Sequence, residues 1–322
     1  MIKASLTNLT LGIFDIGILT GDKAPSQAIR ESLALARAGE AMGYRRYWLG
    51  EHHEQHYAWV KPGFMIPLLA AHTQRLRLGT AATLLCLYNP LQIAEEIHTL
   101  EAMFPGRIDY GVCSAAPSDD ELRAALWGAT TSMREVSQSF GEKVALLLAY
   151  LRRDFVPGHR FEHGPTPLLD RVGPLWMMGT GAGSAQLAAE FCTGFSYSLF
   201  HKHSREDPAV AVIYTDRFGV GARDKISAGA EPEMPSLNLA VSLICAETER
   251  EALQQKNWVE NAQSEFRVNV WGEPAQCKAQ LEALAERYKT SDLLLFMMYP
   301  DLEQRLRGYG LLSEIMALHT SA

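Results

Sequence analysis

Three consecutive polar residues, Glu51-His52-His53, follow a short apolar segment and are the first candidates for chemistry. A histidine there could transfer protons near neutral pH, and Glu51 could orient it or accept hydrogen bonds from buried backbone N–H groups. Adjacent side chains of an extended backbone point in opposite directions, so only one of the two histidines is expected to face a reaction site. A metal site that includes His56 is the competing interpretation, although H-H-x-x-H is not a ligand spacing of any regular element. Taken alone, the three residues are more typical of a structural role than of catalysis.

A glycine-rich run, Gly179-Thr180-Gly181-Ala182-Gly183-Ser184, follows another apolar segment and precedes a predicted helix at Ala185–Glu190. Glycines let a ligand approach the backbone, and a helix N-terminus offers free N–H groups to an anion, so the run is a candidate phosphate site. A dinucleotide-binding fingerprint is disfavoured because the third glycine falls one position early and no first βαβ unit surrounds the run. An ordinary tight turn is the alternative.

Small residues end a third apolar segment in the run Leu78-Gly79-Thr80-Ala81-Ala82, as expected where a flat group approaches the backbone. Small residues also simply pack against one another, and that alternative stays open. Cys113 ends a fourth apolar segment. A reactive thiol there requires an electropositive neighbour, and a buried, inert cysteine is the more common state.

These candidates lie in a chain that alternates short apolar segments with amphipathic ones, which is typical of βα units. The predicted strands are Leu9–Leu19, Arg45–Glu51, Leu76–Leu85, Arg107–Cys113, Pro174–Gly179, Gly194–Phe200, Leu237–Ala246 and Asp292–Met298. Besides Ala185–Glu190, the predicted helices include Pro25–Met42, Phe64–His72 and Leu91–Met103. Eight strands alternating with helices favour an α/β fold, a single (β/α)8 TIM barrel over residues 1–322, rather than an open doubly wound sheet. Chemistry in such a barrel lies at the carboxyl ends of the strands, where the candidate residues fall.

Three segments are longer than ordinary connections between a strand and a helix: Ser114–Thr131, Arg152–Val172 and Gly219–Pro235. Long irregular loops at the carboxyl face of a barrel are candidates for lids that cover the substrate. For the last segment, a tolerated surface insertion is an equally good interpretation.

The composition limits the kinds of partner. With 47% hydrophobic and 21% charged residues, the 322-residue chain has the makeup of a globular protein with a large core. Its formal charge of −7, from 37 acidic and 30 basic residues, argues against nucleic-acid binding because the basic residues form no long run. No apolar run is long enough to span a membrane, and none reads well as a signal peptide. Five separated cysteines without a C-x-x-C pair favour reduced thiols in a cytoplasmic protein over disulfides or structural zinc.

Several motifs, taken in order along nearly the whole chain, carry a resemblance to a known family. They are Gly43 to Trp48 with Glu51-His52-His53, Arg77 to Ala82, Pro90 to Glu95, Thr99 to Asp109, Leu175 to Thr180, Ser184 to Ala189, and Gly272-Glu273-Pro274 with Gln280-Leu281. Together they resemble the bacterial luciferase-like, flavin-dependent monooxygenases, and specifically their small single-chain oxidoreductase branch. Each motif is weak alone, but the combination is specific.

The resemblance implies a two-component enzyme in which a separate flavin reductase supplies reduced FMN (FMNH2). The flavin would lie across the barrel mouth and react with O2 to give a flavin hydroperoxide, which oxygenates a small organic substrate such as a natural-product intermediate. His52 matches the family's catalytic histidine, with Glu51 beside it. The implied cofactor-binding residues are Thr80, Ala81, Ala82, Cys113, Ser114, Gly179, Thr180, Gly181 and Ser184. The Ala81-Ala82 bond matches a site where the family often has a non-prolyl cis peptide beneath the flavin ring, and many relatives form homodimers.

One departure from the family concerns the flavin phosphate. The family usually has an arginine after the fourth strand to pair with it, and this chain has Ser114 there. A hydroxyl replaces neither the charge nor the reach of a guanidinium. Lys202, flanked by His201 and His203, could supply replacement charge, and a solvated loop is the alternative interpretation of that segment.

Two other functions remain open. One is a deazaflavin-dependent hydride transferase, because the same superfamily includes such enzymes, although Trp48–His53 and Phe104–Asp109 look more like the flavin branch. The other is a non-catalytic barrel, either a partner subunit or a flavin-storage protein. Ser114 favours this second alternative, whereas intact Glu51-His52-His53 and Thr180-Gly181 oppose it. The sequence does not specify the substrate.

Overall fold

The computed structural model describes residues 9–117, 119–127, 133–153, 155, 157–162, 172–219, 234–262 and 265–318. Eight parallel strands within these ranges form a barrel: β1 (Thr10–Asp15), β2 (Arg46–Leu49), β3 (Arg77–Thr80), β5 (Ile108–Cys113), β6 (Leu175–Gly179), β7 (Gly194–Ser198), β8 (Leu237–Cys245) and β10 (Asp292–Phe296). The barrel closes because β10 pairs with both β1 and β8, with Leu294 opposite Gly12. Two short strands extend it, β4 (Thr83–Leu84) beside β5 and β9 (Val270–Gly272) beside β8. The predicted (β/α)8 barrel is confirmed.

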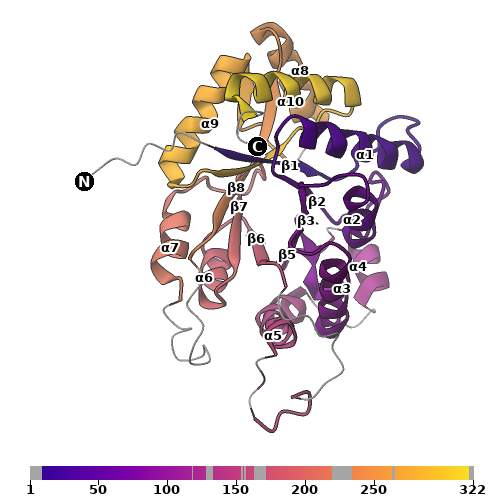
Figure 1. Cartoon of the computed structure of the whole chain (residues 1–322), viewed down its shortest axis with the longest axis vertical. Helices are drawn as coiled ribbons and strands as arrows, with labels where there is room; N and C mark the ends of the chain where they lie inside the picture. The colour runs from indigo at the N-terminus through magenta and orange to yellow at the C-terminus, as the bar shows by residue number, and fades with distance from the viewer. Residues whose placement is uncertain are drawn as a thin grey trace.

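Helices cover the outside of the strands (Figure 1). They are α1 (Pro25–Ala41), α2 (Pro62–Ala70), α3 (Pro90–Met103), α4 (Asp120–Trp127), α5 (Met133–Arg152), α6 (Ala182–Glu190), α7 (Ala209–Arg217), α8 (Glu249–Ala262), α9 (Pro274–Tyr288) and α10 (Leu302–Met316), with a 3-10 turn at Leu85–Leu87. In Figure 1, α1, α2 and α3 lie along one side of the barrel, and α8, α9 and α10 gather on another. Within the described ranges, no helix is both long and apolar enough to cross a membrane.

Local sequence signals explain where several of these helices begin. A proline occupies the first turn of α1, α2, α3 and α9, where its missing N–H removes no helical hydrogen bond. Asn89 caps α3 and Asp301 caps α10, each through its side-chain oxygen. A capping box between Glu273 and Gln276 begins α9.

A buried ionic cluster closes the amino-terminal end of the barrel interior. Asp109 is fully buried and accepts hydrogen bonds from Arg46 Nε at 3.1 Å and from Trp48 Nε1 at 3.2 Å. Arg77 Nη2 pairs with the same carboxylate at 2.6 Å. Arg46 also pairs with Asp292 and lies over the Trp48 ring. Paired charges therefore occupy the amino-terminal end of these strands.

Most strands lie within two residues of their predicted bounds, and two predicted strands differ more. β1 ends at Asp15 rather than Leu19, because Gly17 adopts a φ of +62° and turns the chain against the Trp59 ring. A side chain at Gly17 would collide with that ring. The segment predicted as one strand at Leu76–Leu85 is divided into β3, the Ala81-Ala82 peptide, β4 and the 3-10 turn.

One predicted irregular segment contains a helix. α4 lies within Ser114–Thr131. At the start of this helix, the Asp119 carboxylate accepts a hydrogen bond from Leu122 N at 2.7 Å. Acidic residues in its first turn also favour this helix end. α6 begins at Ala182, three residues earlier than predicted. Of the other two long segments, residues 163–171 and 220–233 lie outside the described residues, so their proposed role as lids stays a prediction.

Candidate active site

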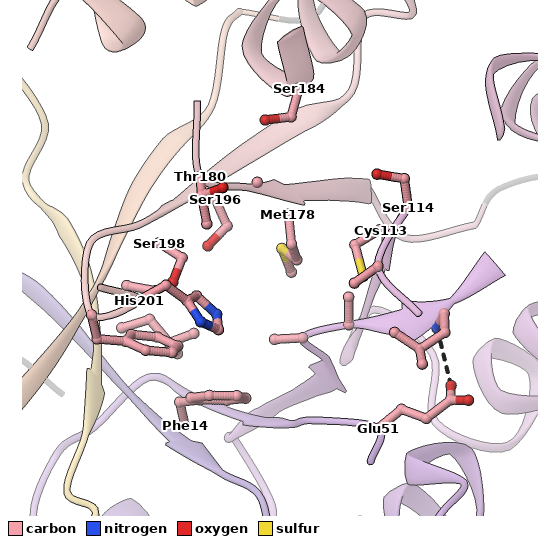
Figure 2. Close-up of a pocket in the computed structure, with 18 of the residues that line it drawn as sticks. Phe14, Glu51, Cys113, Ser114, Met178, Thr180, Ser184, Ser196, Ser198 and His201 are labelled. Atoms are coloured by element: carbon pink, nitrogen blue, oxygen red, sulfur yellow. Dashed lines mark hydrogen bonds between the residues drawn. The ribbon is translucent and has the colours of Figure 1, made fainter. Parts of the chain in front are cut away.

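A cavity of about 560 Å3 lies at the carboxyl ends of the barrel strands (Figure 2). Pockets that bind small molecules typically measure about 300–1,000 Å3. The wall contains all but one of the residues predicted for the site: Glu51, His52, Ala81, Ala82, Cys113, Ser114, Gly179, Thr180, Gly181 and Ser184. Residues far apart in the sequence therefore meet in one space of suitable size.

Ala81 and Ala82 form part of the cavity floor, and the peptide bond between them is cis, as the family resemblance implies. Thr80 does not line the cavity. It is fully buried, and its hydroxyl donates to Gly111 O at 2.7 Å and accepts from Gly111 N at 2.9 Å. Thr80 therefore fixes β3 against β5 behind the floor, and any contact with a cofactor would be indirect.

Glu51 is a hydrogen-bond acceptor for three surrounding groups. Its carboxylate accepts from Tyr88 Oη at 2.7 Å and from Leu84 N at 3.0 Å, and it lies 2.7 Å from His53 Nε2. The side chain is almost fully buried. Of the two roles considered from the sequence, the structure favours satisfaction of a buried backbone donor, because Glu51 is paired with His53 and not with His52. Glu51 thus holds β4 next to the floor.

His52 lines the cavity, as expected if only one of the two adjacent histidines faces it. Its ring stacks on Tyr57 with centroids 4.1 Å apart, and its Nδ1 lies 3.8 Å from Glu54 Oε2. Interaction with His52 is the largest cause that lowers the pKa of Glu54 to about 2, against the opposing effect of burial. Glu54, which sequence reasoning missed, is therefore the carboxylate beside this histidine.

The structure gives no support to a metal site at these residues. His56, the fourth ligand of that interpretation, packs its ring on Tyr57 with centroids 4.3 Å apart. Over the part of the chain described, no group of three or more His, Cys, Asp or Glu side chains is placed to hold a metal ion.

Cys113 and Ser114 line the wall that follows β5. Burial is the main cause that raises the pKa of the Cys113 thiol to about 12. The thiol is therefore protonated near neutral pH, and a reactive thiolate is disfavoured. Beside it, Cys86 donates a hydrogen bond through Sγ to Ala115 O at 3.0 Å, which ties the 3-10 turn to the segment after β5.

The glycine-rich run forms the N-terminus of α6, with Gly181 as the residue before the helix. Ser184 Oγ donates to Gly181 O at 2.9 Å, which closes the first turn. A Cβ on Gly181 or Gly183 would meet no atom within 4 Å, so both backbone segments border open space. The N–H groups of the first turn and the positive end of the helix dipole are the features that bind anions at other helix N-termini.

Sequence reasoning missed the two serines of β7 and considered His201, which follows this strand, only beside Lys202 as a source of charge. Ser196, Ser198 and His201 all line the cavity. Ser196 Oγ donates to the buried Asn238 Oδ1 at 2.6 Å, whereas Ser198 Oγ is buried and has no hydrogen-bond partner among the described residues. The sequence did contain a signal for them. Ser196 and Ser198 are two residues apart in a predicted strand, so their side chains are expected to point to the same face.

His201 is a neutral member of this wall. Burial is the main cause that lowers its pKa from 6.5 to about 4, and the neighbouring His203 and His52 lower it further. His201 therefore does not supply the replacement charge suggested by the sequence at neutral pH. Lys202 is exposed and is not part of the cavity wall.

This lowered pKa predicts a specific loss of stability in acid. The unfolded chain protonates His201 near pH 6.5, whereas the folded protein does so only near pH 4, so the free energy of unfolding falls as the pH drops between these values. The contribution is about 3 kcal/mol at most. Urea unfolding at pH 7 and pH 4 should show that His201→Gln loses less stability than the unsubstituted protein. His72→Gln, an exposed control, should lose as much as the unsubstituted protein. An equal loss in all three would contradict the prediction.

Comparison with known proteins identifies the family. Residues 9–267 match the family model of luciferase-like monooxygenases. The chain belongs to the luciferase-like monooxygenase family. It is 29% identical over 288 residues to N-acetyl-S-alkylcysteine monooxygenase of Bacillus subtilis (strain 168). This alignment covers 87% of this chain and 81% of that protein. The solved structure of apo-MsnO8 is 26% identical and covers 97% of this chain and 99% of that chain, with a TM-score of 0.82.

Two more distant solved structures share the fold of this member of the luciferase-like monooxygenase family. One is the oxygenating constituent of 3,6-diketocamphane monooxygenase from Pseudomonas putida in complex with FMN, with a TM-score of 0.71, 16% identity, and coverage of 96% of this chain and 98% of that chain. The other is an F420-dependent secondary alcohol dehydrogenase, with a TM-score of 0.64, 18% identity, and coverage of 97% and 99%. Proteins that share this barrel therefore include one solved with FMN and one that depends on F420.

Proposed function

We propose that this luciferase-like monooxygenase uses reduced FMN and O2 to oxygenate a small organic substrate, with His52 as its proton-transfer residue. The observation that carries the proposal is one cavity that His52, the Ala81-Ala82 floor and the N-terminus of α6 all border. Separately, none of these features specifies an activity. Together they supply a proton carrier, a flat surface and an anion-binding helix end within one site.

The residues of the cavity fit a flavin mononucleotide. The N-terminus of α6, at Gly183 and Ser184, would hold the phosphate through backbone N–H groups. Ala81, Ala82 and Met178 would provide the apolar surface for the flavin ring. Reduced FMN supplies the electrons and the position at which O2 is activated. The protein's own contribution is to bind, to orient and to exclude water.

His52 would exchange the proton that oxygenation requires. Glu54 lies beside Nδ1 and Tyr57 stacks on one face of the ring, so both neighbours restrict the orientation of the imidazole. This arrangement leaves Nε2 as the ring nitrogen for exchange with a bound group. Glu51 acts as a positioning residue in this account, because its hydrogen bonds fix Leu84 and His53 around the floor.

The proposal includes a separate flavin reductase as the source of reduced FMN. A fold relative named as the oxygenating constituent of a monooxygenase, and solved with FMN, supports this division of labour. Assembly as a homodimer in the cytoplasm is also part of the proposal. A deazaflavin-dependent activity is the outcome to be distinguished by experiment, since a second fold relative uses F420.

A charge placed at the start of α6 should separate FMN from riboflavin. Gly183→Asp adds a carboxylate at a position with open space, and an acidic residue in the first turn favours the helix itself. We expect the dissociation constant for FMN to rise about tenfold, because the new charge repels the phosphate. Riboflavin has no phosphate, so its affinity should change little. Quenching of flavin fluorescence measures both.

Gly183→Ala is the matched control, because it adds a Cβ without charge and should leave both affinities close to those of the unsubstituted protein. Equal weakening of FMN and riboflavin by Gly183→Asp would contradict a phosphate site at α6. An unchanged affinity for FMN would contradict it as well.

A further inference from the structure

Aromatic rings form one side of the cavity, and none of them is among the residues proposed to bind the flavin. We define the aromatic wall as Phe14, Phe200 and Phe266, all buried side chains that line the cavity. The Phe14 and Phe200 rings are stacked with centroids 5.7 Å apart, and Phe266 meets Phe200 edge-on at 5.5 Å. Figure 2 shows Phe14, Ser198 and His201 on one side of the cavity, with Cys113 and Ser114 on the other.

The wall lies across the barrel from the floor residues after β3, whereas the proposed phosphate site follows β6, the neighbour of β7. Phe14 lies in β1, and Phe200 follows β7, so the wall belongs to the part of the barrel opposite β3 and β5. Phe266 joins it because its backbone forms a bridge with His201. His52, which follows β2 beside β1, is the proposed proton-transfer residue next to this side.

The segment that carries the wall is held in place by hydrogen bonds. Arg267 Nη2 donates to His201 O at 3.2 Å and to Ser204 O at 2.9 Å, and Arg267 N donates to Phe200 O at 2.8 Å. The wall is therefore a preformed surface, which reduces the ordering that binding must impose.

Two polar groups, Ser198 and His201, line the cavity beside these rings, and one of them lacks a hydrogen-bond partner among the described residues. Ser198 Oγ is buried with no hydrogen-bond partner among the described residues, and Ser198 itself is only 8% exposed. A buried hydroxyl without a partner is rare in proteins, so a ligand oxygen is a suitable complement. His201 carries no charge near neutral pH, so it does not attract an anion.

Two carboxylates lie near Tyr57, the ring beside His52. The charges of Glu54 and Glu265 both act on Tyr57, whose pKa is raised chiefly by burial and then by these two carboxylates. Tyr57 in turn stacks on His52. Negative charge near His52 disfavours an anionic substrate group on this side of the cavity.

We propose that the aromatic wall binds a planar, uncharged aromatic substrate through ring contacts, with a hydroxyl or carbonyl oxygen of the substrate at Ser198 Oγ. Aromatic rings associate favourably in offset or edge-on arrangements, and a flat substrate presents its face to several rings at once. The inference rests on the proposed function, because that function assigns the floor at Ala81-Ala82 and the N-terminus of α6 to the flavin.

The test uses three related probes with the full chain, measured by calorimetry with and without oxidised FMN. 2-Naphthol is planar, uncharged and bears one hydroxyl; decahydro-2-naphthol keeps the hydroxyl but has no aromatic ring; 2-naphthalenesulfonate keeps the rings but is anionic. We expect 2-naphthol to bind about fivefold more tightly than decahydro-2-naphthol and about tenfold more tightly than 2-naphthalenesulfonate. FMN should not displace it.

Ser198→Ala should weaken 2-naphthol about fivefold, which corresponds to one hydrogen bond, and change the affinity for FMN by less than about twofold. Ser26→Ala, at an exposed position of α1, is the matched control and should change neither. Equal affinity for the three probes, or no effect of Ser198→Ala, would overturn the inference. Displacement of 2-naphthol by FMN would overturn it too, because one surface would then serve both ligands. If the probes behave as expected but FMN does not bind, the proposed function fails and the aromatic subsite stands.

Discussion

Replacement of His52 by alanine is expected to lower the rate of substrate oxygenation about 10²- to 10⁴-fold, the range for loss of a general acid or base. His52 lines the cavity, and its contacts to Glu54 and Tyr57 orient it. The proposed phosphate site at α6 is separate from His52, so affinity for FMN should be nearly unchanged. The measurement is product formed per unit time at saturating reduced FMN, followed by mass spectrometry.

The control for this substitution is His72→Ala, which removes an exposed histidine that bonds only within its own helix region, through Leu68 O. Its activity should equal that of the unsubstituted protein. A His52→Ala protein that oxygenates at the normal rate would contradict the assignment of His52. A parallel loss of FMN affinity would show instead that the residue serves binding.

Asp109→Ala is expected to destabilise the protein by about 3–5 kcal/mol, the usual cost of removing one partner of a buried ion pair. The carboxylate is fully buried between Arg46 and Arg77 and accepts the Trp48 indole N–H. Without it, Trp48 Nε1 loses its acceptor and the two guanidinium groups lose a shared counter-charge at a buried position. Urea unfolding followed by circular dichroism gives the free energy of unfolding.

Asp22→Ala, at an exposed turn, is the control and should change this free energy by less than about 0.5 kcal/mol. If Asp109→Ala does not fold, Asp109→Asn provides the measurement, because the amide oxygen still accepts from Trp48 and a smaller loss is expected. A loss below about 1 kcal/mol for Asp109→Ala would contradict the role of the cluster in stability.

The fold was predictable because its strands are buried on both faces and are therefore nearly continuous apolar runs. β8 (Leu237–Cys245) is buried along its whole length and was predicted within one residue. β9 was missed because three residues, Val270–Gly272, are too short to show a pattern. The end of β1 was misplaced because the turn at Gly17 is set by the approach of Trp59 from another segment.

The site was partly predictable for a topological reason. A barrel brings the carboxyl ends of its strands together, so residues such as Ala82, Cys113 and Thr180 were expected to meet, and they line one cavity. The partner of His52 was not predictable, because a loop decides that Glu54 and not Glu51 lies beside it. Phe266 was missed for the same reason, since its place in the cavity depends on a bridge between distant loops.

The most direct test of the account is an anaerobic calorimetric titration of the full chain with reduced FMN, in parallel with reduced deazaflavin F420. The cavity, its floor at Ala81-Ala82 and the helix N-terminus at Gly183 predict saturable binding of reduced FMN, tighter than that of the deazaflavin. Absence of saturable FMN binding, or tighter binding of the deazaflavin, would contradict the proposal that this protein is an FMN-dependent monooxygenase.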